Sequence, residues 1–284
     1  MRSLNGRKFR TFAVILPAIV LSSYFAVPAW LLHSHLDRLV FVGNAGAVAS
    51  HQDREWSISA GPDRSVLVRL YGDDQSNRCA VFFPGQHGGI PDYEQKPFAW
   101  FRMMGVAVYA LSYPGYDGAT GSAQVSTLIP DVGEALSYVD AHTACRLSNA
   151  VFVGRSLGAT VAVASATKFR PRGILLDGAS PGLADAVRAF MRRRAITRPW
   201  TLLPVEALVR DEYRLVPQLR RLSTVPVRIF QGTADDVTPF KDISVAVKPL
   251  PNVSLIPVPG GAHSDSYILA KEEYLRQLSS LLGD

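Results

Sequence analysis

The chain opens with one long apolar segment. Phe12 to Leu32 runs for about 21 residues without a charge, close to the ~20 that a helix needs to cross a hydrocarbon core. Pro17 and Pro28 lie towards its two ends, where a membrane helix tolerates them. This pattern predicts a transmembrane or signal-anchor helix.

The rest of the chain alternates short apolar runs with stretches of helical spacing. Trp56–Ala60 and Val66–Leu70 flank a turn at Gly61-Pro62-Asp63 and predict a hairpin. Six β-branched or aromatic runs follow that suit buried strands: Ala80–Phe83, Val106–Ser112, Val151–Val153, Gly173–Leu176, Val227–Phe230 and Val253–Val258. Helical spacing marks Ile129–Ala141, Leu157–Lys168 and Lys271–Leu282.

Alternating strands and helices predict an α/β fold with a mainly parallel sheet covered on both faces. Hydrophobic residues make up 48% of the 284 positions and charged residues 19%, which suits a large packed core and argues against general disorder. The stretch 181–224 is too long for a simple crossover, so we expect a helical insertion over one end of the sheet.

Charge refines the interpretation of the N-terminus. The net charge is +6, and one basic cluster precedes the apolar segment: Arg2, Arg7, Lys8 and Arg10. Cations before a membrane helix keep that end in the cytoplasm. We therefore expect residues 1–45 to form a cytoplasmic tip, anchor and linker, and residues 46–284 to form a periplasmic or extracellular domain.

Two other interpretations of the apolar segment stay open. Val27-Pro28-Ala29 offers the small residues of a signal-peptide cleavage site. Alternatively, the segment is a buried helix of a cytosolic protein. The basic clusters lack the interleaved aromatic residues of a single-strand nucleic-acid binder, so no nucleic-acid partner is expected.

The strongest chemical signal is Gly154-Arg155-Ser156-Leu157-Gly158, which follows a predicted strand and opens a helix of small residues. A serine on such a tight turn projects its hydroxyl above the sheet, and the flanking glycines remove side chains that would clash. The amide of Leu157 lies at the helix N-terminus and can donate to an oxyanion. Ser156 is thus the predicted nucleophile.

With this motif the sequence resembles the α/β-hydrolase superfamily over roughly residues 54–283, and it is most similar to a membrane-anchored, serine-aminopeptidase-like branch. The resemblance implies an eight-stranded, mostly parallel sheet with helices on both faces and a helical lid at about 181–224. It also implies a serine hydrolase without metal or organic cofactor.

The resemblance places the catalytic acid in Gln231-Gly232-Thr233-Ala234-Asp235-Asp236, after the strand Val227–Phe230. The family's acid stands three residues after the glycine, which gives Asp235. Its carboxylate would fix the tautomer of a histidine and stabilise the charged ring. Asp236 is the alternative acid.

Gly260-Gly261-Ala262-His263 follows the last predicted strand and matches the family's histidine loop. A histidine of near-neutral pKa can accept the serine proton and return it to the leaving group. The order serine, aspartate, histidine is that of α/β-hydrolases, so His263 is the predicted base.

The loop Phe83-Pro84-Gly85-Gln86-His87-Gly88-Gly89 matches the turn where relatives usually read His-Gly-x. The resemblance makes the amide of Gln86 the second oxyanion donor, beside that of Leu157. Pro84 departs from the usual histidine, which affects the turn but not the backbone donor. We interpret His87 as a turn residue.

Three further residues are predicted to bind the substrate. Tyr113 and Tyr116 lie in a loop that resembles the family's aromatic-glycine loop, Tyr113-Pro114-Gly115-Tyr116-Asp117-Gly118. They either line the pocket or pack structurally. Arg155, next to the nucleophile, is the third.

The two cysteines, Cys79 and Cys145, each precede an apolar run. A disulfide is permitted if the domain is extracytoplasmic, and unpaired thiols are the alternative. The resemblance implies that the third and fifth strands are neighbours, which would bring the two cysteines to the same edge.

The insertion is rich in arginine, with residues 188, 192, 193, 194, 198, 210, 214, 220 and 221. Lipid headgroups, an acidic substrate group or plain solvation each explain this cluster. Asp211-Glu212-Tyr213 resembles a structural turn of the branch.

Taken together, these motifs predict hydrolysis of an ester or thioester in a small or lipid-like acyl substrate. A peptidase of the serine-aminopeptidase type and a membrane-tethered, non-catalytic binding protein are the alternatives, because fold alone does not fix function.

Overall fold

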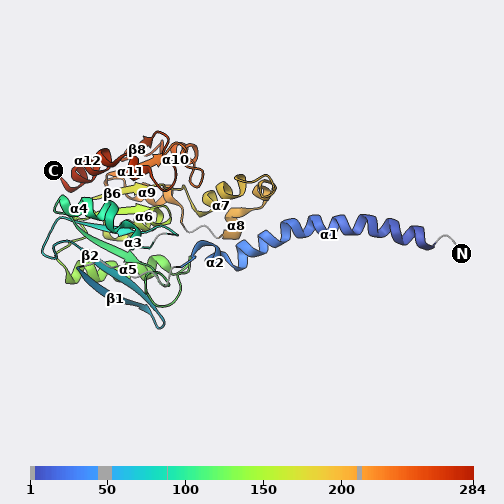
Figure 1. Cartoon of the computed structure of the whole chain (residues 1–284), viewed down its shortest axis with the longest axis horizontal. Coiled ribbons are helices and arrows are strands. Elements are labelled where there is room, and N and C mark those ends of the chain that lie inside the picture. The colour runs from blue at the N-terminus through green and yellow to red at the C-terminus, as the bar shows by residue number, and fades with distance from the viewer. Residues whose placement is uncertain (1–3, 44–52, 88, 210–212) are drawn as a thin grey trace.

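A computed structural model describes residues 4–43, 53–87, 89–209 and 213–284, with side chains from residue 16 onward. The chain begins with α1 (Leu4–Ser34), which projects from the rest of the molecule, followed by the short α2 (Leu36–Val40) (Figure 1). Within the described residues, one helix, at Leu16–Ser34, is long and apolar enough to cross a membrane, a property that a signal sequence shares.

The core is a single eight-stranded sheet in the order β1-β2-β4-β3-β5-β6-β7-β8. The strands are β1 (Arg54–Gly61), β2 (Arg64–Tyr71), β3 (Cys79–Phe83), β4 (Ala107–Ser112), β5 (Val151–Arg155), β6 (Gly173–Asp177), β7 (Val227–Gly232) and β8 (Val253–Val258). The β1–β2 hairpin is antiparallel, and β2 pairs antiparallel with β4. All other pairs are parallel. The predicted mostly parallel sheet is confirmed.

Helices cover both faces of the sheet. One face packs against α5 (Leu128–His142), α6 (Leu157–Phe169), α9 (Leu215–Arg221) and α10 (Phe240–Val247). The other packs against α3 (Pro91–Tyr93), α4 (Ala99–Met103), α11 (Ser266–Leu269) and α12 (Lys271–Leu282), with a short π-helical turn at Glu94–Phe98. Along β3, Val81 and Phe83 enter the first core, whereas Ala80 and Phe82 enter the second. This period-two alternation lets one apolar strand serve two cores.

The insertion at 181–224 is helical, as expected. It contains α7 (Leu183–Arg192), a 3-10 turn at Arg198–Leu202, α8 (Val205–Val209) and α9. The sequence did not predict α3, α4 or α10, which are short, and Pro91 and Pro97 interrupt the periodicity around the first two.

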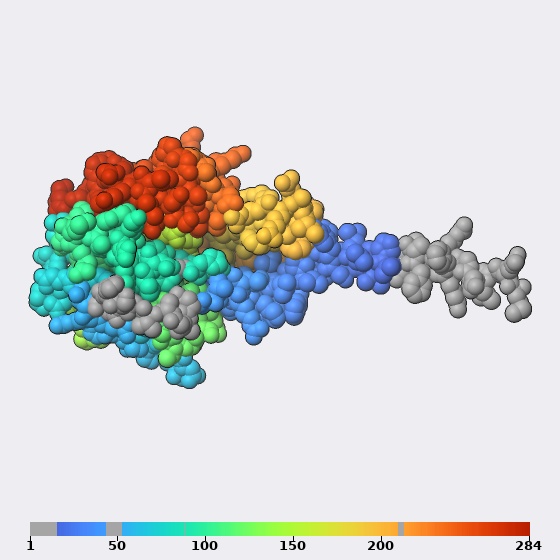
Figure 2. All heavy atoms as spheres, viewed as in Figure 1, coloured from blue at the N-terminus to red at the C-terminus, as the bar shows by residue number. Residues whose placement is uncertain are grey.

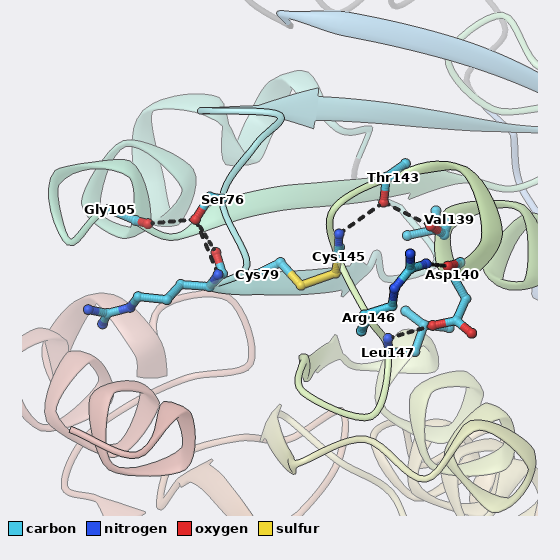
Figure 3. Close-up of a disulfide and its surroundings, with 10 residues drawn as sticks. Ser76, Cys79, Gly105, Val139, Asp140, Thr143, Cys145, Arg146 and Leu147 are labelled. Atoms are coloured by element: carbon cyan, nitrogen blue, oxygen red, sulfur yellow. Dashed lines mark hydrogen bonds between the residues drawn. A yellow bond between two sulfur atoms is a disulfide. The ribbon is translucent and has the colours of Figure 1, made fainter.

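A disulfide joins Cys79, the first residue of β3, to Cys145 in the loop after α5, with Cα atoms 5.7 Å apart (Figure 3). The neighbouring backbone is fixed by side chains, since Thr143 Oγ1 accepts the amide of Cys145 at 3.2 Å and Asp140 Oδ1 accepts that of Leu147 at 2.8 Å. Both cysteines are fully buried.

Several predictions fall outside the described residues. These are the 45/46 boundary, Gly88 of the oxyanion loop, Arg210, Asp211 and Glu212 of the insertion, and the side chains of Arg2, Arg7, Lys8 and Arg10.

Candidate active site

Ser156 lies on a strained turn between β5 and α6. Its backbone has φ 54° and ψ −119°, a combination that costs a non-glycine residue about 1–3 kcal/mol and persists only when its surroundings impose it. The amide of Ser156 donates to the carbonyl of Asp177 at 2.9 Å, which ties the turn to the end of β6.

Both flanking glycines are required by close approach. A Cβ on Gly158 would lie 2.0 Å from the carbonyl oxygen of Phe83, and one on Gly154 would lie 2.5 Å from that of Gly158. Helix α6 therefore rests directly on the sheet, because neither position carries a side chain.

The three residues predicted as nucleophile, base and acid lie together although they come from three loops. His263 Nε2 is 2.9 Å from Ser156 Oγ, and His263 Nδ1 is 2.8 Å from Asp235 Oδ2. The imidazole thus bridges the hydroxyl and the carboxylate at hydrogen-bond distance on both sides, which is the geometry that nucleophilic catalysis by serine requires.

Asp235 is buried but well supplied with donors. Its Oδ1 accepts the amides of Val237 and Thr238 at 2.9 and 2.8 Å, and its Oδ2 accepts the hydroxyl of Thr238 at 2.8 Å. Burial alone would raise the pKa of Asp235, but the hydrogen bond and charge of His263, together with the Thr238 donors, lower the pKa below its ordinary value. The site therefore favours the carboxylate form.

Asp236, the alternative acid, pairs with an arginine on the surface instead of with His263. Its side chain is exposed and forms an ion pair with Arg193 of the insertion, at 2.6 Å. Of the two neighbouring aspartates, only Asp235 contacts His263 in the part of the chain that the structure describes.

The loop after β3 passes beside the serine. A Cβ on Gly85 would lie 3.4 Å from Ser156 Cβ, so the backbone of this loop approaches the serine at Gly85, directly before Gln86. Among the described residues, the structure contains no protein acceptor for the amide of either Gln86 or Leu157. The side chain of Gln86 turns away and donates to the carbonyl of Leu39 in α2 at 2.9 Å. His87 is exposed in the same turn.

Tyr113 and Tyr116 hydrogen-bond to the backbone of this loop. Both are buried, and their hydroxyls donate to the carbonyls of Pro84 and Gln86 at 3.2 and 3.0 Å. Of the two expectations for these rings, structural packing accounts for the observed contacts. Contact with a substrate stays a prediction.

Arg155 also makes internal contacts. Its guanidinium donates to the carbonyl of His263 at 2.8 Å and to the hydroxyl of Tyr93 at 3.2 Å. Its Nε lies 3.3 Å from Asp177 Oδ2 as an ion pair without hydrogen-bond geometry. These contacts describe a positioning role, and binding of a substrate by Arg155 stays a prediction.

Sequence reasoning missed Asp177, the last residue of β6. Its carboxylate is fully buried, and burial raises its pKa to about 6 although Arg155 and His263 act in the opposite direction. The available signal was a charged residue directly after a run of four buried strand positions, Gly173–Leu176.

No group of three or more His, Cys, Asp or Glu side chains within the described ranges could hold a metal ion.

Comparison with known proteins identifies the family of this chain. The sequence model of the alpha/beta hydrolase family matches residues 80–277. An uncharacterised protein of Mycobacterium tuberculosis is 29% identical over 170 residues, which are 58% of this chain and 56% of that protein. Protein bem46 of Schizosaccharomyces pombe is 23% identical over 177 residues, 62% of this chain and 57% of its own length. The chain thus spans somewhat more than half the length of these curated relatives.

Solved structures show the same fold at low sequence identity. An esterase from Pyrococcus furiosus superposes with a TM-score of 0.67 at 13% identity, covering 84% of this chain and 95% of that one. An alpha-beta hydrolase from Vibrio vulnificus gives a TM-score of 0.67 at 16% identity, covering 81% of each chain. With the family match extending over most of the sheet, the chain belongs to the alpha/beta hydrolase family.

Proposed function

We propose that this protein is a membrane-anchored serine hydrolase that cleaves an ester or thioester through a covalent acyl-enzyme. One observation carries the proposal: the imidazole of His263 lies within 2.9 Å of both the hydroxyl of Ser156 and the carboxylate of Asp235. An esterase is also among the proteins of similar fold.

In the proposed reaction, Ser156 Oγ attacks the carbonyl carbon while His263 Nε2 takes the hydroxyl proton. Asp235 stabilises the imidazolium and holds Nδ1 as the protonated nitrogen. The ring then gives its proton to the leaving alcohol or thiol. Water, deprotonated by the same ring, releases the acid and restores Ser156.

The amides of Gln86 and Leu157 would stabilise the oxyanion of the tetrahedral intermediate. The first directly follows Gly85, which approaches Ser156. The second follows Ser156 and begins a helix of 13 residues whose N-terminal end carries partial positive charge. One such donor typically contributes about 10²–10³ in rate.

We place the catalytic domain outside the cytoplasm, tethered by α1. The apolar helix and the preceding cations support this orientation. A buried disulfide is also common in secreted and periplasmic proteins and rare in the cytosol.

A fluorophosphonate probe tests the proposal, because it reacts covalently with an activated serine. The wild-type chain and the control Ser254→Ala, altered at an exposed position of β8, should label, whereas Ser156→Ala should not. Absence of labelling in all three would favour a non-catalytic binding protein. Parallel assays with p-nitrophenyl esters and aminoacyl p-nitroanilides then separate esterase from peptidase activity.

A further inference from the structure

The arginine-rich insertion packs on α1 rather than only on the catalytic domain. Leu32 of α1 is buried in an apolar cluster with Ala184, Met191, Val205 and Val209 of α7 and α8. Nearer the middle of α1, the ring of Tyr24 lies 5.6 Å from that of Trp200, and its hydroxyl donates to the carbonyl of Ile196. Figures 1 and 2 show the insertion lying along the end of α1 closest to the domain.

These contacts fix how deep the insertion would lie if α1 crosses a membrane. The apolar segment ends near Leu32, or at Ser34 by the extent of the helix. Tyr24 precedes Leu32 by eight residues, and at 1.5 Å per residue it lies roughly 12 Å inside that end. The residues touching Tyr24 must then lie at the level of the outer leaflet.

The surface of the insertion around Ile196 and Trp200, which contact Tyr24, suits a lipid interface. We call Phe190, Ile196 and Leu202, with Arg194 and Arg198, the lid tip. Its three apolar side chains are 60%, 69% and 82% exposed. Both arginines are exposed, and neither forms an ion pair within the described residues. Apolar residues flanked by cations are typical of surfaces that enter anionic bilayers.

We propose that the lid tip is embedded in the outer leaflet of the same bilayer that α1 crosses, with its arginines at the anionic phospholipid headgroups. The occupant is the bilayer because the insertion contacts the apolar helix α1 at Tyr24, and α1 itself exposes Ile19, Val20 and Leu21, each by more than half.

This placement also holds the candidate site at the membrane. Arg193, beside the lid tip, pairs with Asp236, next to the proposed acid Asp235. From the other side, Leu39 of α2 accepts the side chain of Gln86. On the proposed function, the substrate class is therefore acyl esters that reside in the bilayer and reach Ser156 without crossing bulk water.

Spin labels in the full-length protein test the depth independently of any activity. Leu202→Cys and Met103→Cys each add one labelling site. Met103 is a similarly exposed apolar residue (76%) in α4, which lies at the far end of the domain from α1. In vesicles of phosphatidylcholine and phosphatidylglycerol, the label at 202 should collide more with oxygen than with a water-soluble nickel chelate, and the label at 103 should do the reverse. A water-exposed label at 202 would overturn the proposal.

A second measurement tests the substrate class. The double variant Ile196→Glu with Leu202→Glu should lower hydrolysis of a vesicle-borne phospholipid ester about tenfold or more, because each buried charge opposes insertion. Hydrolysis of soluble p-nitrophenyl acetate should stay within about twofold, since both side chains are largely exposed. Equal rates on vesicles would overturn the bilayer-resident substrate class. If no ester is hydrolysed by any form while the label at 202 reads as embedded, only the proposed function fails.

Discussion

Arg155 and His263 are joined by a hydrogen bond of 2.8 Å from the guanidinium to the backbone carbonyl of the histidine. The residue that precedes the candidate nucleophile thus holds the loop of the candidate base. Arg155 itself is fixed by Tyr93 and by the buried carboxylate of Asp177. The spacing between Ser156 and His263 therefore depends on a contact that needs no substrate.

Arg155→Met should lower both activity and stability. The histidine loop loses its donor, and the buried carboxylate of Asp177 loses the cation that pairs with it, a change that typically costs about 3–5 kcal/mol. Adding Asp177→Asn should recover much of the stability but not the rate of ester hydrolysis. Urea unfolding and kcat/KM of both variants check this, and full recovery of activity in the double variant would contradict the positioning role.

Asp235→Asn should reduce kcat by roughly 10⁴, because an amide in place of the carboxylate favours the wrong tautomer of the imidazole. Steady-state hydrolysis of a p-nitrophenyl ester measures the loss. The neighbouring Asp236→Asn is the matched control and should retain nearly full activity, since Asp236 pairs with Arg193 on the surface. A comparable loss of kcat in both variants would contradict the assignment of Asp235 as the single catalytic acid.

Asp177 should make stability fall as pH rises from about 4 to 6. The buried carboxyl has its pKa raised to about 6, so between these limits the folded state binds more protons than the unfolded state. Asp177→Asn removes this contribution, and the stability of the variant relative to wild type should rise by on the order of 3 kcal/mol between pH 4 and 7.

Urea unfolding at a series of pH values measures that difference. The lowered pKa of Asp235 has the opposite sign, because stability is lost as pH falls through the folded-state value, but it acts in both proteins and largely cancels. A pH-independent difference between wild type and Asp177→Asn would contradict the prediction.

The disulfide should contribute to stability rather than to chemistry. Cys79 and Cys145 close a loop with a sequence separation of 66 residues, for which the chain-entropy account gives about 4 kcal/mol. Replacing both cysteines by alanine should lower the free energy of unfolding by about 2–4 kcal/mol and leave kcat at 25 °C unchanged. Reduction of the wild type is the control, and it should lower the unfolding midpoint to a similar extent.

The sequence predicted those features that are encoded locally or by order along the chain. The period of the apolar runs predicted the sheet, and glycine spacing predicted the turn at Ser156, because close packing at Gly154 and Gly158 excludes any side chain. The roles of Ser156, Asp235 and His263 remain predictions for the experiments above.

The sequence did not predict the contacts that depend on sheet register. Arg155 and Asp177 face each other because β5 and β6 are parallel neighbours that end at the same level, and no local pattern encodes that register. The hydroxyls of Tyr113 and Tyr116 likewise donate to carbonyls about 30 residues earlier. The packing of α1 on the insertion joins Tyr24 to a residue 172 positions away, which periodicity cannot reveal.

Gln86 allows the proposed backbone donor to be separated from its side chain. The side chain binds only Leu39 among the described residues, so Gln86→Ala should keep the amide and change kcat by no more than a few-fold. Gln86→Pro removes the N–H, and its kcat should fall by about 10²–10³, the usual effect of one oxyanion donor. Thermal unfolding shows whether the proline variant is folded, and its KM should change far less than its kcat. Equal losses in the alanine and proline variants would place the contribution of residue 86 in its side chain rather than in its amide.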